Sequence, residues 1–452
     1  MAKILIEHAT VLSVDENNTI HDPGFIYVDG DHIAAVGPDA GSDALVGEAE
    51  QIIDASNMLI MPGMINAHVH LFQSFVRGLA DDRPLLRWLK EIVWPVFAHM
   101  TAQDVYYAAM ISLIENVRGG ATAMIDNHYV HIDPDSDDAV CRAAEQMGIR
   151  YKLARGWADE NYHPSLQETP QRILAELERL FREWHGQAEG RISVECGPLI
   201  PWGCSDETML KTYALAQAWD AGLQMHVSET QDEVQMSLHA VGMRPIEWLA
   251  GLGLLGPHMQ LVHSVWLSER EMELIAESAS VVVHCPVSNM FLASGVSPIA
   301  DLWARGVPVA LATDGQACNN GQEMIEMPRA ALNLQKVATL DATVLKPADV
   351  LHMASRGGAA AFGQRATLGS LEPGKKADLT LVSLVDTRFL PGMERQSALV
   401  NFAAKQDVDS VMVDGEFVMR AGQILTLEVE SILEEARRAR IDLLRRAGIE
   451  TH

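Results

Sequence analysis

The sequence predicts an α/β fold, a (β/α)8 TIM-type barrel with a small β-sandwich domain built from both chain ends. Two patterns predict it. Between residues 58 and 364, short apolar runs typical of buried strands alternate with longer amphipathic stretches typical of helices. Outside that region, short strand-like runs are separated by Asp-Gly and Pro-Gly turns. The barrel is therefore expected to interrupt the sequence of the β domain.

The two ends of the chain show a similar pattern of short strands separated by turns. Residues 1–57 contain KILIEHATVLSV, FIYVDG and HIAAVG, and residues 365–426 contain GSLEPGKKADLTLVSL and DSVMVDGEFVMRAGQIL. We expect these segments to pair into one small β-sandwich domain. A charged helix is predicted over Glu428–Arg446, within a C-terminal segment of residues 427–452.

Eight β/α units are predicted in the region between them, residues 58–364. In a closed parallel barrel the catalytic groups lie at the C-terminal ends of the strands, so these ends are the places to search. The predicted strands are Leu59–His68, Ala121–Asp126, Arg150–Arg155, Ile192–Gly197, Leu223–Val227, Gln260–His263, Val281–His284 and Val307–Thr313. The predicted helices include Asp104–Val117, Gln171–Trp184, Asp206–Asp220 and Glu269–Ala276.

The composition is that of an ordered globular protein, with 48% hydrophobic and 21% charged residues among 452. The net charge of −27 opposes binding to nucleic acid or anionic membranes, and no apolar run approaches the ~18 residues of a membrane span. The first residues do not resemble a signal peptide. The five cysteines are scattered and show no CxxC spacing, which argues against disulfides and against a cysteine zinc site. They are Cys141, Cys196, Cys204, Cys285 and Cys318. We therefore expect a cytoplasmic protein.

Candidate metal ligands follow the predicted strands. His68 and His70 are separated by one residue, and because side chains alternate along a strand, both rings point to one face. His226 lies in the fifth predicted strand, His263 ends the sixth, and Asp314 follows the eighth. One such histidine is more often structural, but the joint pattern favours a site for zinc or ferrous iron with a position left for water.

A carboxylate lies beside one of these candidate ligands, in His226-Val227-Ser228-Glu229. Glu229 is close enough in sequence to reach a water activated at the strand end, and it is the candidate general acid/base. Taken alone, Glu229 fits equally well as an exposed acid at the start of a helix, since the residues after it are rich in the acids typical of helix N-termini. The neighbouring ligand favours the catalytic interpretation.

Several motifs together resemble the amidohydrolase superfamily, in its deaminase/chlorohydrolase branch. They are PGMINAHVH, HVSE, the strand end at His263-Ser264-Val265, HCPVSNMFLASGVSPI, ATDG and GSLEPGKKADLTL. That branch contains s-triazine hydrolases, 8-oxoguanine and guanine deaminases, and methylthioadenosine/S-adenosylhomocysteine deaminases. The likeness covers nearly the whole chain.

The resemblance implies roles for the candidate residues. His68, His70, His226 and Asp314 are similar to the ligands of one divalent ion, with Zn²⁺ favoured and Fe²⁺ an alternative. Glu229 is similar to the proton shuttle and His263 to the histidine that orients water or polarises the substrate, while Asp314 would also receive the proton of the water. The fourth predicted strand, RISVECGP, lacks the lysine that bridges two metals in binuclear members, so a mononuclear site is expected.

Two departures from the family bear on the substrate. Nucleoside deaminases of this branch carry Gly-Pro-His after the fourth strand, where this chain has Leu199, and a ribose-binding glutamate where this chain has Phe97. Ribose hydroxyls buried without partners would cost about 1–3 kcal/mol each. A bare ring is therefore favoured, with aromatic walls drawn from Trp88, Trp94, Phe97, Trp157, Trp202 and Phe291.

The expected function is hydrolytic deamination of an amino-substituted nitrogen heterocycle without ribose: an s-triazine, a pyrimidine or a purine-type base. Ammonia leaves only when protonated and chloride needs no proton, so Glu229 favours deamination over the alternative of a chloro-s-triazine hydrolase. A methylthioadenosine, S-adenosylhomocysteine or adenosine-type deaminase is the other alternative. The family also implies a homodimer or larger assembly. The candidate substrate contacts are Gln73, Trp88, Arg155, Trp202 and Asn319.

Overall fold

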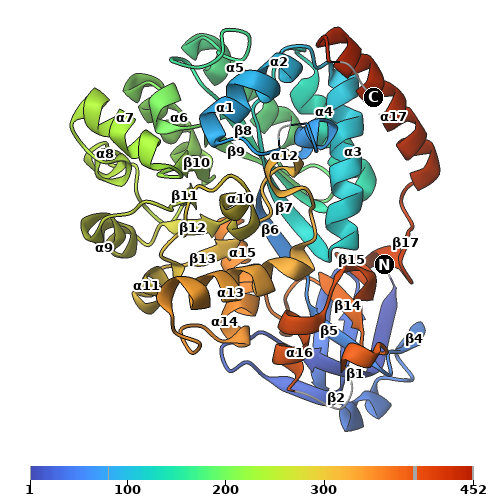
Figure 1. The fold of residues 1–452 in the computed structure, drawn as a ribbon. Helices are drawn as coiled ribbons and strands as arrows, with labels where there is room; N and C mark the ends of the chain where they lie inside the picture. Colours follow the sequence, from blue (N-terminus) through green and yellow to red (C-terminus); the bar gives the residue numbers. More distant parts are fainter. Residues whose placement is uncertain (1, 80, 390–393, 450–452) are drawn as a thin grey trace.

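The computed structural model describes residues 2–79, 81–389 and 394–449 and contains two sheets (Figure 1). An eight-stranded parallel sheet forms a barrel surrounded by helices, and a nine-stranded mixed sheet from both chain ends lies below it in the view. The predicted fold class is confirmed. Residues 450–452 of the predicted C-terminal segment lie outside the described residues.

The barrel strands follow one another in chain order, each parallel to the next. The sheet closes between its last and first strands, where the backbone N–H of Asp314 donates to the carbonyl of His68 at 3.0 Å and Thr313 N–H donates to Asn66 Oδ1 at 3.0 Å. The strands are β6 (Met64–Val69), β7 (Ala121–His128), β8 (Arg150–Trp157), β9 (Ile192–Pro198), β10 (Leu223–Val227), β11 (Met259–His263), β12 (Val281–His284) and β13 (Val309–Leu311).

Helices cover the outside of the barrel, and several begin at capping boxes that satisfy their first N–H groups. Thr101 with Asp104, Thr230 with Glu233, and Ser268 with Glu271 form these boxes. The longer helices are α3 (Ala102–Arg118), α4 (Ser136–Met147), α5 (Pro170–Trp184), α6 (Asp206–Ala218), α7 (Gln231–Val241), α9 (Glu269–Ser278) and α13 (Met327–Thr339). The shorter ones are α1 (Leu85–Trp88), α2 (Trp94–Phe97), α8 (Pro245–Gly251), α10 (Pro286–Phe291), α11 (Ile299–Ala304), α12 (Gln316–Asn319), α14 (Pro347–His352) and α15 (Gly358–Ala361).

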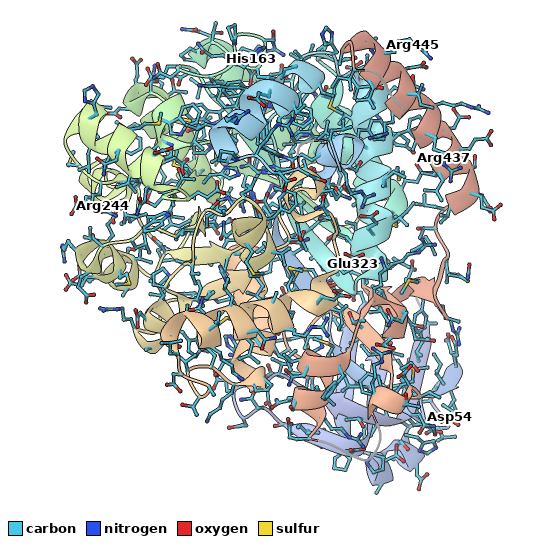
Figure 2. All side chains as sticks on the ribbon, viewed as in Figure 1. Asp54, His163, Arg244, Glu323, Arg437 and Arg445 are labelled. Atoms are coloured by element: carbon cyan, nitrogen blue, oxygen red, sulfur yellow. The ribbon has the colours of Figure 1, made fainter. Side chains whose placement is uncertain are left out.

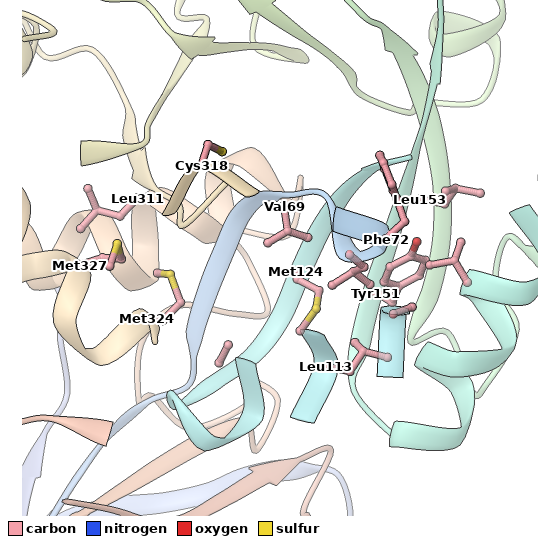
Figure 3. Packing of buried hydrophobic residues seen from close by; sticks show 14 of the residues in the cluster. Val69, Phe72, Leu113, Met124, Tyr151, Leu153, Leu311, Cys318, Met324 and Met327 are labelled. Carbon is pink, nitrogen blue, oxygen red and sulfur yellow. The ribbon is translucent and has the colours of Figure 1, made fainter. Parts of the chain in front are cut away.

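A continuous apolar core fills the layer between strands and helices. Val69 on β6, Met124 on β7 and Leu113 on α3 belong to it, as Figure 3 shows. Phe72 packs edge-to-face on Phe97 with ring centroids 4.8 Å apart. This packing holds the short segment after β6, and with it the histidines at the end of that strand.

The second sheet joins β1 (Lys3–Leu12), β2 (Ile20–Asp29), β3 (His32–Pro38), β4 (Gln51–Asp54) and β5 (Met58–Pro62) to β14 (Leu379–Ser383), β15 (Val408–Val413), β16 (Glu416–Arg420) and β17 (Gln423–Ile424). The two chain ends meet where β5 pairs antiparallel with β14. The single strand predicted over Leu59–His68 is therefore two strands. Pro62 and Gly63 separate the part that joins this sheet from the part that joins the barrel.

A buried ion cluster links the barrel to the second sheet. Arg150, at the start of β8, donates to both carboxylate oxygens of Asp378, at 2.7 and 3.0 Å, and also to Asp414. All three side chains are nearly inaccessible to solvent. Because the guanidinium bridges two buried carboxylates, the joint depends on it.

The remaining helices lie at the C-terminal side of the chain. α16 (Arg395–Phe402) packs against α14, with Arg395 paired to Asp22 of β2 at 2.7 Å, and α17 (Val429–Arg446) runs along α3 (Figure 1). Figure 2 shows Arg437 and Arg445 along α17. The chain from residue 2 to 449, as far as it is described, has no helix with the length and apolarity needed to cross a bilayer.

Replacing Arg150 by alanine should lower the free energy of unfolding by about 3–5 kcal/mol, because two buried carboxylates lose their partner. Urea unfolding followed by circular dichroism measures the change. Arg182→Ala is the control, since that side chain is 68% exposed and its loss should change the value by less than about 0.5 kcal/mol. Equal stability of the two variants would contradict the assigned role of the cluster.

Candidate metal centre and active site

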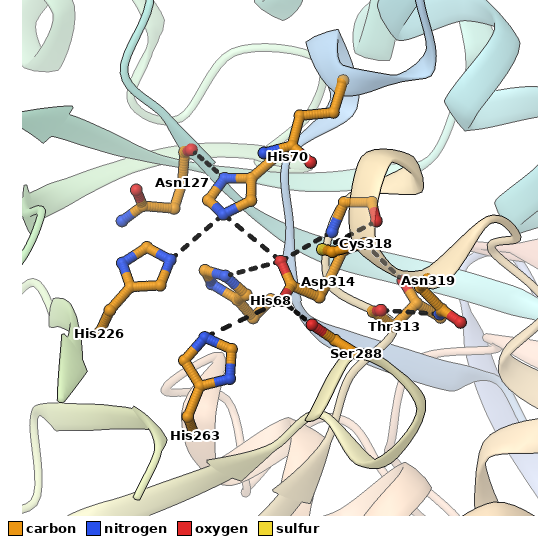
Figure 4. Close-up of polar contacts among 12 residues, drawn as sticks. His68, His70, Asn127, His226, His263, Ser288, Thr313, Asp314, Cys318 and Asn319 are labelled. Atoms are coloured by element: carbon orange, nitrogen blue, oxygen red, sulfur yellow. Dashed lines mark hydrogen bonds and ion pairs between the residues drawn. The ribbon is translucent and has the colours of Figure 1, made fainter. Parts of the chain in front are cut away.

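Three imidazoles and one carboxylate converge at the C-terminal mouth of the barrel (Figure 4). His70 Nε2 lies 3.5 Å from Asp314 Oδ1 and 3.2 Å from His226 Nε2, and His68 Nε2 lies 3.6 Å from Asp314 Oδ1. All four residues are buried. The structure thus brings together the four residues that the sequence predicts as metal ligands.

The backbone bends sharply where the strands deliver these groups. Ser228, His263 and Asp314 have φ values of 52°, 69° and 65°, in the left-handed region that costs a non-glycine residue roughly 1–3 kcal/mol. Cross-strand bonds hold the bends, among them Ser264 N–H to the Val227 carbonyl at 3.1 Å. The strained strand ends turn these side chains into the barrel mouth.

The inner nitrogen of each candidate ligand histidine faces a fixed acceptor. Nδ1 of His68 lies 2.7 Å from Gln224 Oε1, that of His70 lies 2.7 Å from the Asn127 carbonyl, and that of His226 lies 2.7 Å from the Leu199 carbonyl. An acceptor at Nδ1 places the ring proton there and leaves Nε2 with a free lone pair. Nε2 of His68 is buried without a hydrogen-bond partner.

The protonation states suit a cation. Burial, together with the charges of neighbouring histidines, lowers the pKa of His70 to about 3 and that of His226 well below its usual range. Burial alone would raise the pKa of Asp314, but the nearby histidines, His68 foremost, hold that pKa well below normal. The neutral rings of His70 and His226, the ionised carboxylate of Asp314 and the unpartnered Nε2 of His68 fit one divalent metal ion.

Glu229 lies beside this cluster and is buried. Ser294 Oγ donates to Glu229 Oε1 at 2.8 Å, and Glu229 Oε2 lies 3.6 Å from His263 Nε2. Burial raises the pKa of Glu229 well above its usual range, and the carboxylates of Glu233 and Asp314 add to the rise. A carboxyl group in such a setting can hold a proton at neutral pH and deliver it to a leaving group.

His263 differs from the ligand histidines in its partner. Asn289 Nδ2 donates to His263 Nδ1 at 3.1 Å, so the ring proton lies on Nε2, which faces Glu229 at 3.6 Å and Asp314 Oδ2 at 3.9 Å. A protonated Nε2 is a hydrogen-bond donor and not a metal ligand. His263 is therefore placed to orient a water or a substrate oxygen.

A cavity opens above these groups. Its lining is mostly apolar and aromatic, as expected for a flat heterocycle. It consists of His70, Gln73, Leu85, Trp88, Leu89, Tyr129, Tyr162, Leu199, Ile200, Trp202, His226, Glu229, Glu233, His263, Leu292, Asp314 and Cys318.

Three of the five predicted substrate contacts line this cavity: Gln73, Trp88 and Trp202. Their polar groups are held in place, since Gln73 Nε2 donates to Tyr129 at 3.2 Å, Trp88 Nε1 to the Ala317 carbonyl at 3.1 Å, and Trp202 Nε1 to Glu233 at 3.3 Å. Gln73 Oε1 is buried and has no hydrogen-bond partner in the part of the chain that the structure describes. It is an acceptor available to a substrate N–H.

The other two predicted contacts, Arg155 and Asn319, are absent from the described lining of the cavity. The Arg155 guanidinium is fully buried and pairs with Glu168 at 2.9 Å and Asp137 at 3.3 Å. Asn319 Nδ2 donates to the Thr313 carbonyl at 2.7 Å, which fixes the turn after Asp314. Both side chains thus bond to other groups of the protein, although Arg155 Nη1 has no hydrogen-bond partner among the described residues.

Several lining residues were not predicted from the sequence. Tyr129 follows β7 directly, so the rule that strand ends carry the site could have indicated it. Tyr162 lies in the loop after β8 and gives no comparable signal. Glu233 belongs to the capping box of α7, and its position in that motif predicts a helix cap but not a residue that lines the cavity. Phe97 packs on Phe72 and is not part of the lining.

Comparison with known proteins places this site in a family. The amidohydrolase family matches residues 59–418. The chain belongs to the amidohydrolase family. A 5-methylthioadenosine/S-adenosylhomocysteine deaminase from Pelotomaculum thermopropionicum is 35% identical over 99% of this chain and 100% of its own length. A 5'-deoxyadenosine deaminase from Methanothermobacter thermautotrophicus is 38% identical over 93% of this chain and 95% of its own length.

Solved structures of related proteins share the whole fold. An adenosine deaminase from Xanthomonas campestris with bound zinc is 29% identical, has a TM-score of 0.92 and covers 98% of this chain and 99% of its own. An atrazine chlorohydrolase from Arthrobacter aurescens, complexed with zinc, is 24% identical with a TM-score of 0.90, over 97% and 100%. The predicted deaminase/chlorohydrolase branch is confirmed, and the chain is a hydrolytic enzyme of the deaminase type.

Purified protein should contain about one equivalent of tightly bound divalent metal, and His226→Ala should lose it, because one of four ligands is removed. Inductively coupled plasma mass spectrometry on desalted protein measures the content. His258→Ala is the control, since that ring is 59% exposed and lies outside the clusters of candidate ligands in the described chain. Full metal occupancy in His226→Ala would contradict the ligand assignment.

Proposed function

We propose that this enzyme is a zinc-dependent hydrolytic deaminase that releases ammonia from an amino-substituted nitrogen heterocycle without ribose. The observation that carries the proposal is the joint placement of four ligand groups and buried Glu229 at the floor of an apolar cavity. One Zn²⁺ ion would be held by His68, His70, His226 and Asp314, and Fe²⁺ suits the same donors. Zinc in two structural relatives supports this choice.

When bound, the metal would supply the Lewis acidity that activates a water for attack on the ring carbon. Asp314 Oδ2, which accepts from Ser288 at 2.7 Å, is placed to take the proton of that water. His263 would orient the attacking oxygen through Nε2–H. Glu229 would give its proton to the amino group, so that a C–O bond forms, the C–N bond breaks and neutral ammonia leaves.

The cavity wall supports a bare ring as substrate. Leu199 lines it where the nucleoside deaminases carry a histidine, and Phe97 is packed away in the core. Trp88 and Trp202 offer aromatic surface for stacking. An s-triazine, a pyrimidine or a purine-type base is the substrate class that these walls favour.

A second candidate is a nucleoside deaminase, because relatives at 35–38% identity are named as 5-methylthioadenosine/S-adenosylhomocysteine and 5'-deoxyadenosine deaminases. Glu233 and Tyr162 in the cavity wall are polar groups that could meet a sugar. A chloro-s-triazine hydrolase is a third candidate, and Glu229 argues against it because chloride leaves without a proton. The ammonia and chloride released from matched substrates separate the three.

The proposal includes a cytoplasmic homodimer or larger homo-oligomer. All five cysteines are buried and free, which suits a reducing compartment. Exposed apolar side chains such as Val337 and Leu340, 66% and 90% exposed, support an interface between copies. Light scattering that finds only the 49.5 kDa chain mass would contradict the assembly.

Glu229→Gln should lower kcat for ammonia release by about 10²–10⁴-fold, because the amide cannot deliver the proton. Metal content should stay at the wild-type level, since the residue is not among the ligands. Glu207→Gln, at a side chain 79% exposed on α6, is the matched control and should leave kcat unchanged. A Glu229→Gln enzyme as fast as wild type would remove Glu229 from the mechanism.

Bare aminotriazines, aminopyrimidines or aminopurines should be deaminated with kcat/KM at least about tenfold higher than the matching nucleosides, since each unpartnered hydroxyl costs about 1–3 kcal/mol. A coupled ammonia assay on pairs such as adenine and adenosine measures the ratio. A reversed ratio would establish the nucleoside alternative. Release of chloride without ammonia from chlorinated triazines would establish the third candidate.

A further inference from the structure

A chain of buried hydrogen bonds runs through the barrel interior from a metal-ligand histidine to a lysine. His68 Nδ1 lies 2.7 Å from Gln224 Oε1, and Gln224 Nε2 donates to Gln260 Oε1 at 2.7 Å. Gln260 Nε2 donates to Glu195 at 2.9 and 3.0 Å, and Lys152 Nζ lies 3.3 Å from Glu195 Oε2. We call these five residues the interior relay.

Neighbouring strands supply the relay, and solvent does not reach it. Lys152 lies on β8, Glu195 on β9, Gln224 on β10 and Gln260 on β11, and His68 lies on β6. Their exposed fractions are 8%, 0%, 0%, 2% and 0%. In such surroundings an unmade hydrogen bond costs about 1–3 kcal/mol, so each member must present the matching atom to the next.

The chemistry of the members gives the relay one direction. Burial raises the pKa of Glu195, and the charge of Lys152 and the hydrogen bond from Gln260 oppose that rise. As a carboxylate paired with Lys152, Glu195 only accepts, so Gln260 must turn its NH₂ group toward it. The Gln260 oxygen then faces Gln224 and accepts a hydrogen bond from the NH₂ group of Gln224. The Gln224 oxygen in turn faces His68 Nδ1. A proton on Nδ1 is the arrangement that satisfies every contact.

We propose that Glu195, acting through the amides of Gln260 and Gln224, sets the tautomer of His68 and thereby keeps its Nε2 lone pair free for the metal. Glu195 is a positioning residue, three hydrogen bonds away from the ligand ring. A second bond assists, because Gln224 Nε2 also donates to the Ala67 carbonyl at 2.9 Å. The inference rests on the proposed metal site and adds the part of the fold that prepares one of its ligands before the ion binds.

Two variants and their combination separate this role from simple packing. Glu195→Gln removes the group that only accepts, so Gln260 becomes free to turn and Gln224 is oriented by the Ala67 carbonyl alone. Zinc affinity should then fall about tenfold, as for other groups that orient ligands. Gln224→Glu places a carboxylate against His68 Nδ1, which needs no orientation from Gln260. In that background Glu195→Gln should change zinc affinity by less than about twofold.

The measurement is the zinc Kd of metal-free protein, obtained by competition with a chromogenic chelator, with the thermal midpoint recorded for each variant. Ser193→Ala on the same strand is the control, since its hydroxyl has no hydrogen-bond partner, and it should leave the Kd unchanged. If Gln224→Glu does not fold, Gln260→Met breaks the relay without adding charge and should weaken zinc binding as Glu195→Gln does.

Three outcomes would overturn the proposal. An unchanged zinc Kd in Glu195→Gln, or in Gln260→Met, with only the thermal midpoint lowered, would give the relay a structural role alone. An equal loss of affinity from Glu195→Gln in both backgrounds would show that the effect does not pass through Gln224. Wild-type protein that binds no divalent metal would overturn the proposed function and the relay together, whereas the first two outcomes leave the proposed function intact.

Discussion

The backbone hydrogen bond from Asp314 to the carbonyl of His68, at 3.0 Å, is the contact on which the rest of the structure depends. It joins the end of the last barrel strand to the first and so closes the sheet. It also sets the Asp314 carboxylate 3.6 Å from His68 Nε2 and 3.5 Å from His70 Nε2. Closure of the barrel and assembly of the ligand cluster are therefore one event, and the left-handed backbone at Asp314 is its local cost.

Much of the fold follows from local patterns in the sequence. Eight apolar runs separated by amphipathic stretches can bury their surface only as parallel strands under helices, and the structure has all eight. The exception is Leu59–His68, where one apolar run serves two sheets. An apolar run does not show which sheet it joins; that choice depends on pairing of β5 with β14, more than 300 residues away in the chain.

The cluster of candidate metal ligands was predictable because its members lie at or just after strand ends, and strand ends meet at the barrel mouth. The substrate wall was less predictable, because loops supply it. Arg155 ends a strand and was therefore predicted to contact the substrate. Its guanidinium pairs instead with Asp137, on a helix, and Glu168, in a loop, and the strand pattern gives no information on either position. Asn319 likewise donates its hydrogen bond to a backbone carbonyl, and the sequence does not show which side chain a carbonyl will bind.

We propose that His68, His70, His226 and Asp314 hold one metal ion, in positions that the fold prepares before the ion binds. X-ray absorption at the zinc edge of the purified protein tests it most directly. We expect a single zinc with nitrogen and oxygen neighbours at about 2.0–2.2 Å and imidazole scattering from three histidines. Sulfur neighbours at about 2.3 Å, or metal–metal scattering at about 3.5–4 Å, would contradict it.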